Sequence, residues 1–129
     1  MNRRRGLDWP GLLPVVHSRN LAGLLAHYRG TLRFELLQEI SGVVAVLRRG
    51  SLRLQLWQSS GTAPRECSIP LEQRASVFQL YADLAKVARS AMVDDYPCLR
   101  PWGAWEFTMC DPEGNRLIFS QLAVGVHQL

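Results

Sequence analysis

The order of apolar patterns along the chain repeats once, and this repeat most limits what the chain can fold into. Each half begins with a short apolar run, continues with apolar residues at helical spacing, and ends with three strand-like runs. A loop rich in Ser, Gly, Thr and Pro, residues 59–65, separates the halves. The sequence therefore predicts the order β-α-β-β-β over residues 12–58 and again over residues 66–123, although the halves share little sequence.

In the first half, residues 12–17 form an apolar run that predicts a strand. Asn20 offers an N-cap oxygen to the helix that follows, and Gly30 is placed to end that helix. The three strands predicted next cover residues 32–40, 43–47 and 51–57. The last of them alternates, with three leucines on one face and Arg53, Gln55 and Trp57 on the other. If the leucines pack under the helix, the other three side chains face away from it.

The second half contains the strongest helical pattern, over residues 73–92. A strand is predicted before it at 67–71, and three strands after it at 98–100, 104–110 and 116–123. The last two are joined by the turn Asp111-Pro112-Glu113-Gly114-Asn115, with a side-chain acceptor at its start and a glycine for positive φ. Alternation places Trp105, Phe107 and Met109 on one side of their strand.

A helix covers one face of a curved sheet and leaves the other face concave. We therefore predict an α+β protein, with two βαβββ modules forming a cup-shaped mixed sheet and helices on the outer face. The 129 residues are expected to form a single domain, preceded by a basic arm over residues 1–11. Concave apolar cups with a few polar groups are where small ligands bind.

Charge and composition exclude several classes of protein. The net charge of +4 owes much to Arg3, Arg4 and Arg5, and the rest of the chain is close to neutral, so no nucleic-acid partner is expected. No run approaches the roughly 20 apolar residues of a membrane span. The three cysteines have no metal-knuckle spacing, and the amino-terminal stretch lacks the apolar run of a signal peptide. These features predict a cytoplasmic protein in a reducing compartment.

A motif near the carboxyl end resembles a known family. Its parts are Pro101-Trp102-Gly103, Glu106-Phe107 and the turn at 111–115, followed by apolar Leu117 and Phe119. They resemble bleomycin-resistance proteins of the glyoxalase / bleomycin resistance / extradiol dioxygenase (vicinal oxygen chelate) superfamily, whose fold is the doubled β-α-β-β-β order. A weaker similarity lies at the amino end, in Pro14-Val15-Val16, Asn20, His27-Tyr28 and Leu32-Arg33-Phe34-Glu35.

Enzymes of that superfamily hold a divalent metal with ligands from the first and last strands of each half. The resemblance places the equivalent positions near Leu13, at or beside Gln55, near Glu66 or Cys67, and at Ile118. Leucine and isoleucine cannot ligate a metal, so a site would need another ligand such as His17. We therefore expect neither a metal nor another cofactor, and we assign no catalytic residues.

The candidate ligand contacts come from the motif and from the face of the strand at 51–57. Trp102 is either a stacking platform for a planar ligand or a tryptophan of the core or a dimer interface. Glu106 either contacts the ligand or ties Arg116 across the hairpin. The complete predicted set is Trp102, Trp57, Gln55, Glu106, Arg53, Ile118 and Phe34.

Three functions fit this sequence, and we favour the first. It is a metal-free binding protein of bleomycin-resistance type that sequesters a planar, partly apolar molecule in clefts shared by a homodimer, as the resemblance implies, with strands exchanged in many such dimers. The second is a metal-dependent lyase, isomerase or dioxygenase with a variant metal site. The third is a dimeric interaction module whose cup is filled by side chains. Bleomycin-type antibiotics are cationic, so the basic chain and Arg53 favour a neutral or anionic ligand.

Overall fold

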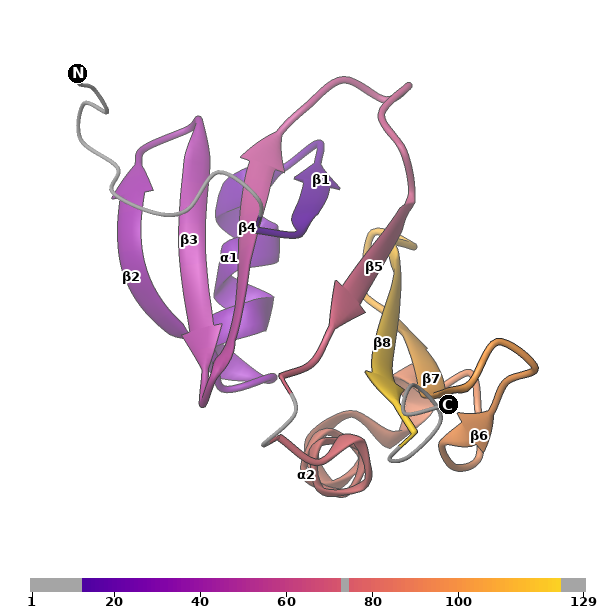
Figure 1. Cartoon of the computed structure of the whole chain (residues 1–129). Helices are drawn as coiled ribbons and strands as arrows, with labels where there is room; N and C mark the ends of the chain where they lie inside the picture. The colour runs from indigo at the N-terminus through magenta and orange to yellow at the C-terminus, as the bar shows by residue number, and fades with distance from the viewer. Residues whose placement is uncertain (1–12, 73–74, 124–129) are drawn as a thin grey trace, which may run out of the picture. The chain divides into compact units, whose positions relative to one another are not determined.

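One helix and four strands follow each other in the predicted order, twice along the chain (Figure 1). This computed structural model describes residues 13–72 and 75–123, so the predicted basic arm with Arg3, Arg4 and Arg5 lies outside the described residues. The chain divides into two compact units, Met1–Arg65 and Glu66–Leu129. Each unit holds one four-stranded mixed sheet, which confirms the α+β class and the two βαβββ modules.

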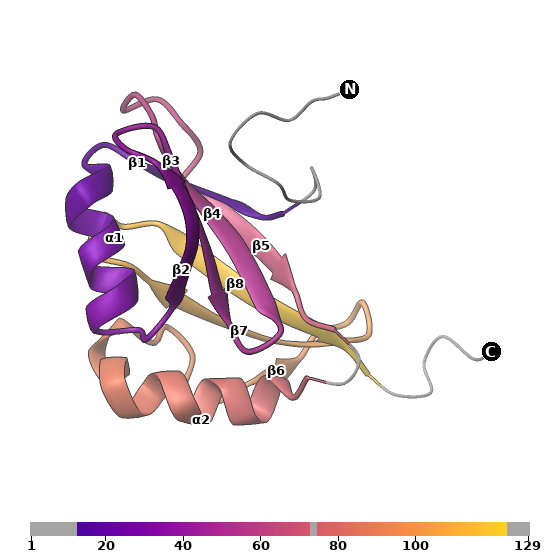
Figure 2. The same ribbon diagram turned by 90° about the vertical axis from the view of Figure 1, so that its left-hand side faces the viewer.

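The first unit contains a sheet with the strand order β1-β4-β3-β2. Its elements are β1 (Val15–Ser18), α1 (Leu21–Gly30), β2 (Glu35–Ile40), β3 (Val44–Arg49) and β4 (Leu52–Gln58). Strand β1 runs parallel to β4, and the other neighbours are antiparallel. Helix α1 lies against one face of this sheet (Figures 1 and 2). The fully buried Leu54 and Leu56 of β4 share that core with Tyr28, as the alternation predicts.

Two details of the first unit differ from the sequence prediction. Gly30 does not lie beyond α1 but is its last residue, and Thr31 follows in right-handed helical conformation. The positive φ lies instead at Arg33, at 66°. The chain therefore turns after residue 30 and enters β2 only at Glu35, three residues later than predicted. Asn20 does cap the helix, because its side chain accepts a hydrogen bond from the Gly23 amide.

The second unit has the strand order β5-β8-β7-β6. Its elements are β5 (Glu66–Pro70), α2 (Val77–Ala88), the 3-10 turn η1 (Arg89–Ala91), β6 (Cys98–Leu99), β7 (Ala104–Cys110) and β8 (Arg116–Leu122). The helix predicted over 73–92 is thus shorter at both ends; residues 73 and 74 lie outside the described residues. Ser76 caps it through the Gln79 amide, 3.1 Å away. Neither described helix has the length and apolar character needed to cross a membrane.

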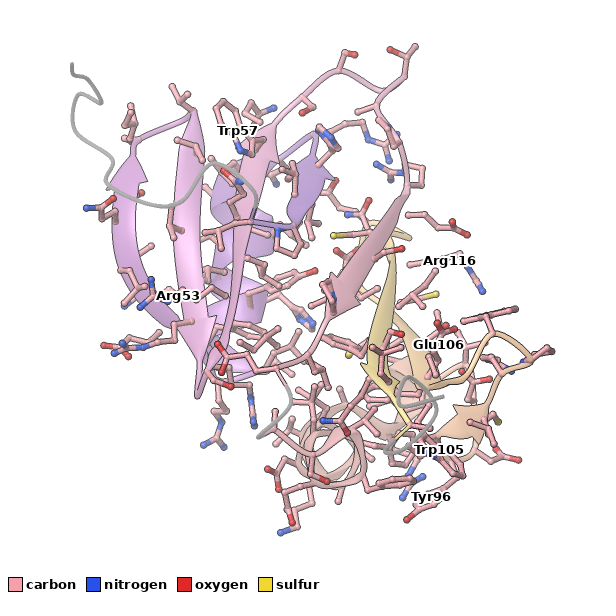
Figure 3. The ribbon with its side chains drawn as sticks, viewed as in Figure 1. Arg53, Trp57, Tyr96, Trp105, Glu106 and Arg116 are labelled. Carbon is pink, nitrogen blue, oxygen red and sulfur yellow. The ribbon has the colours of Figure 1, made fainter. Side chains whose placement is uncertain are left out.

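Aromatic rings form the core between α2 and its sheet. Phe107 stacks on Phe119 at a ring distance of 4.9 Å and meets Tyr81 of α2 edge-on at 5.2 Å. Trp105 lies edge-on to Phe78 at 5.1 Å, and Figure 3 shows it beside the helix. These contacts confirm that Trp105 and Phe107 share the face covered by α2. By strand alternation Glu106 lies on the opposite face.

The turn between β7 and β8 is organised by Asp111, as its sequence predicts. One carboxylate oxygen of Asp111 accepts from the amides of Glu113 (2.9 Å) and Asn115 (3.0 Å), and the other accepts from the Asn115 side chain. Gly114 supplies the positive φ of 84°. This turn sets Cys110 opposite Arg116 and thereby fixes the register of the whole hairpin.

A glutamine from the last strand holds the start of the helix in each unit. Gln58 accepts from the amide of Leu21, the first residue of α1, and donates to the Arg19 carbonyl. Gln121 of β8 does the same for α2: it accepts from the Val77 amide at 3.1 Å and donates to the Glu72 carbonyl. The sequence did not predict these two contacts. They satisfy helix-terminal amides that have no partner within the helix.

Candidate functional site

A hydrogen-bonded group around Glu106 occupies the face of the second sheet away from α2. Oε2 of Glu106 accepts from the indole Nε1 of Trp102 (3.0 Å) and from the Ser120 hydroxyl (3.1 Å). Nε of Arg100 lies 3.6 Å from Oε1. We call Arg100, Trp102, Glu106 and Ser120 the Glu106 cluster. The Glu106 side chain is 13% exposed, and both of its carboxylate oxygens lie near these donors.

Trp102 combines a fixed position with an open ring. The residue is 65% exposed, although its only polar atom is bonded to Glu106. An indole that keeps its N–H satisfied can offer a ring face to a planar partner without losing a hydrogen bond. The positive φ of Gly103, 87°, bends the chain directly after Trp102 and into β7.

The suggestion that Glu106 ties Arg116 is wrong. In the hairpin, Arg116 lies opposite Cys110, and Ser120 lies opposite Glu106. Arg116 is instead 3.8 Å from Glu66 on the neighbouring β5, and Figure 3 shows it apart from Glu106. Counting residues outward from the turn would have identified Ser120 as the partner of Glu106.

The loop before β6 supports the Glu106 cluster. Asp94 accepts from the Thr108 amide at 2.8 Å, and its other oxygen lies 3.7 Å from Arg100. Arg100 thus stands between two carboxylates. Sequence reasoning missed Asp94, Arg100 and Ser120, because only the pairing of β6, β7 and β8 brings these residues together.

In the first unit, the face of the sheet away from α1 carries Gln55 and Trp57. Nε2 of Gln55 donates to the Leu13 carbonyl (3.0 Å), and its Oε1 accepts from Nε1 of Trp57 (2.7 Å). Gln55 is only 3% exposed. Trp57 and Leu13 also pack on the buried Val44 and Val46. Both amide atoms of Gln55 therefore have partners within the unit, and its contact with a ligand stays a prediction.

The other predicted contacts occupy different surroundings. Arg53 is exposed on β4, on the same face as Trp57, and Figure 3 shows the two near opposite ends of that strand. Ile118 is half-buried beside Ser68 and Thr108, on the face opposite to Leu117 and Phe119, as predicted. Phe34 is 4% exposed and packs against Tyr28 at 5.6 Å, which gives its ring a core position.

Two of the positions that correspond to metal ligands carry no donor side chain. These are Leu13 and Ile118. The side chain of Gln55 is already hydrogen-bonded to the Leu13 carbonyl and to Trp57. His17 lies opposite Trp57 on β1, but its Nδ1 is 2.7 Å from the Ser59 hydroxyl. Within residues 13–72 and 75–123, no three His, Cys, Asp or Glu side chains are grouped to hold a metal ion.

Two βαβββ units, each with a helix on one face of a mixed sheet, define the class of fold. No family model matches the sequence, and no curated protein does. Solved structures do match: a bleomycin-binding protein complexed with bleomycin is 23% identical, with a TM-score of 0.64 over 89% of this chain and 98% of that one.

Two further structures extend the comparison. A glyoxalase / bleomycin resistance protein / dioxygenase from Nocardioides is 17% identical, with a TM-score of 0.58 over 97% of this chain and 87% of that one. A lactoylglutathione lyase from Agrobacterium tumefaciens is 14% identical, with a TM-score of 0.57 over 83% and 89%. The chain has the fold of this superfamily, which confirms the resemblance at the level of fold.

Proposed function

We propose that the chain is a metal-free small-molecule binding protein of bleomycin-resistance type. It holds a planar, partly apolar ligand against the exposed indole of Trp102. The observation that carries this proposal is the Trp102–Glu106 hydrogen bond, which fixes an indole that is 65% exposed. A prepositioned ring loses little conformational freedom on binding. The bleomycin complex of a protein with the same fold supports a role in sequestration.

We further propose that the binding clefts form between two copies of the chain in the cytoplasm. Leu122 and Trp102, both exposed, share the face of the second sheet that carries Glu106. A second copy covering part of this face would bury apolar surface that a monomer leaves in water. Light scattering coupled to gel filtration should give twice the 14.6 kDa of one chain. A mass of one chain at micromolar protein would contradict the dimer.

The test of ligand binding is titration with 2-naphthamide, a planar neutral probe, followed by tryptophan fluorescence and calorimetry. Trp102→Ala should weaken binding about tenfold or more, because the stacking surface is lost. Its circular dichroism spectrum should match that of wild type, since the ring takes no part in the core of the unit. Tyr96→Ala is the matched control: it removes an aromatic residue that is 58% exposed but that contacts Phe78 and Tyr81 on the helix side.

Glu106→Gln separates positioning from direct contact. Glutamine keeps an acceptor for Trp102 and Ser120 and removes the charge that faces Arg100. If Glu106 only positions the indole, binding of the neutral probe should stay within about twofold of wild type, whereas Glu106→Leu should weaken it severalfold. Equal affinity of wild type, Trp102→Ala and Glu106→Leu for the probe would contradict the proposal that Trp102 is a ligand platform. Stoichiometric, tightly bound metal in the purified protein would sink the metal-free proposal.

A further inference from the structure

The face of the first sheet away from α1 carries a row of charged residues across three strands. Strand register places Glu35 opposite Arg48 and Arg48 opposite Arg53. Directly opposed residues of antiparallel strands project from the same face, so Arg48 and Arg53 are like charges side by side. Such pairs destabilise a sheet unless an anion lies between them.

Among the described residues, Arg48 has an acidic partner and Arg53 does not. Arg48 donates to the Glu35 carboxylate through Nη2 at 2.8 Å and Nε at 3.2 Å. Arg53 is exposed, and within residues 13–72 and 75–123 no carboxylate lies at ion-pair distance from it. Arg49 is occupied elsewhere, since its Nε donates to the Leu32 carbonyl. The row therefore carries one positive charge in excess.

The chemistry of this face changes along the strands. The row next to the charged one contains Val46 and Gln55, and the row after it contains Val44 and Trp57. Arg53 and Trp57 are four steps apart along the strand, which corresponds to about 13 Å between their Cα atoms. A long arginine side chain shortens the span that a ligand must cover. The face is thus cationic at one end and aromatic at the other (Figure 3).

We propose that Arg53, with Arg48 beside it, is an anion subsite of the first unit, which holds the carboxylate or a similar oxyanion of a planar molecule lying along this face of the first sheet. The inference rests on the proposed small-molecule function and adds the class of ligand. Arginine suits this role because its planar guanidinium pairs with an oxyanion through two hydrogen bonds. Glu35 neutralises Arg48, so the row selects for a single negative charge.

Three probes with the same ring and different charge test the subsite. They are 2-naphthoate, 2-naphthamide and 2-naphthylmethylammonium, titrated by calorimetry into the full chain. Naphthoate should bind about tenfold more tightly than the amide, and the ammonium compound should bind most weakly. Arg53→Gln should abolish the preference and leave the amide unchanged. Arg29→Gln, which removes the same charge from an exposed position on α1, should keep the preference. Glu35→Gln should strengthen naphthoate binding, because it frees Arg48.

A second measurement separates this inference from the proposed function. Melting of wild type, Arg53→Gln and Arg29→Gln is compared in sulfate and in chloride at equal ionic strength. A higher melting temperature in sulfate than in chloride that is lost only in Arg53→Gln supports the subsite. This holds even if no naphthalene probe binds and the planar-ligand proposal is wrong. Equal binding of all three probes overturns the subsite and leaves the proposed function standing. If no probe binds and sulfate does not raise the melting temperature in an Arg53-dependent way, the anion subsite and the proposed function are both wrong.

Discussion

The two units have the same order of elements, but they use the face of the sheet away from the helix differently. In the first unit, Leu13 and Trp57 pack over Val44 and Val46, and Gln55 bonds inside that layer. In the second unit the corresponding face carries the Glu106 cluster, which leaves its tryptophan mostly in water. Each tryptophan donates its N–H to a neighbouring acceptor. The ring of Trp57 is part of a packed layer, whereas the ring of Trp102 is open to solvent.

The largest effects on stability in both units should come from substitutions in their cores. Phe107→Ala removes a ring stacked on Phe119 and should cost about 3–5 kcal/mol, whereas Leu54→Ala in the first unit should cost about 2–5 kcal/mol. Urea unfolding followed by circular dichroism measures both. Trp57 fluorescence reports the first unit and Trp105 the second, in variants that keep one tryptophan. A loss below about 1 kcal/mol for Phe107→Ala would contradict the described core.

The turns that lead into the last strand of each unit are the next comparison. Asp111 is buried and accepts from the Glu113 and Asn115 amides and from the Asn115 side chain, so Asp111→Ala should cost about 2–3 kcal/mol by leaving donors without partners. The turn between β3 and β4 depends on Gly50 at a φ of 63°, and Gly50→Ala should cost about 1 kcal/mol. Thermal melting of the two variants measures which loses more stability. A larger loss in Gly50→Ala than in Asp111→Ala would mean that the hydrogen bonds of Asp111 contribute little.

The two glutamines that hold the helix starts should contribute equally to the stability of the two units. Gln58→Ala and Gln121→Ala each remove an acceptor from the first amide of a helix, and each should cost about 1 kcal/mol. Chemical denaturation of both variants checks this. The double variant should lose about the sum of the two, since the glutamines belong to separate networks. A large effect of one glutamine and none of the other would show that the two contacts are not equivalent.

The smallest effects should come from the cross-strand ion pairs. Glu35 is bonded to Arg48 at 2.8 Å, and Glu66 lies 3.8 Å from Arg116, but all four side chains are well exposed. Glu35→Gln and Glu66→Gln should each change stability by less than about 0.5 kcal/mol, and added salt should shrink the change further. Melting at low and high salt tests this. A salt-independent loss above about 1 kcal/mol would point to a buried role.

Local patterns predicted the elements well, because each depends on neighbours in the sequence. The leucines of β4, the Asn20 cap and the Asp111 turn are examples, and all are confirmed. Predictions for single polar side chains were weaker. Gln55 was expected to be available on its face, but β1 lies beside β4, and Leu13, which precedes β1, supplies the carbonyl that accepts from the Gln55 side-chain amide. No property of residues 51–57 indicates that contact.

The contacts within the Glu106 cluster were also not predictable from local sequence patterns. Trp102 and Glu106 could be selected from the motif, but their mutual hydrogen bond could not, nor could the positions of Arg100 and Asp94. Those residues meet through the pairing of the short β6 with β7. The Arg48–Arg53 opposition, in contrast, can be counted from the Arg48-Arg49-Gly50-Ser51 turn once that turn is recognised. Hairpin register is therefore the information that sequence analysis of such a chain should extract first.

The glutamine contacts have a consequence for how each unit opens. The amides of Leu21 and Val77 are protected by side chains from the last strand of their unit, not by bonds inside the helix. Hydrogen exchange at these two amides therefore reports detachment of β4 or β8, even while the helix itself stays wound. One amide in each half thus serves as a built-in reporter of sheet opening, readable without any added probe group.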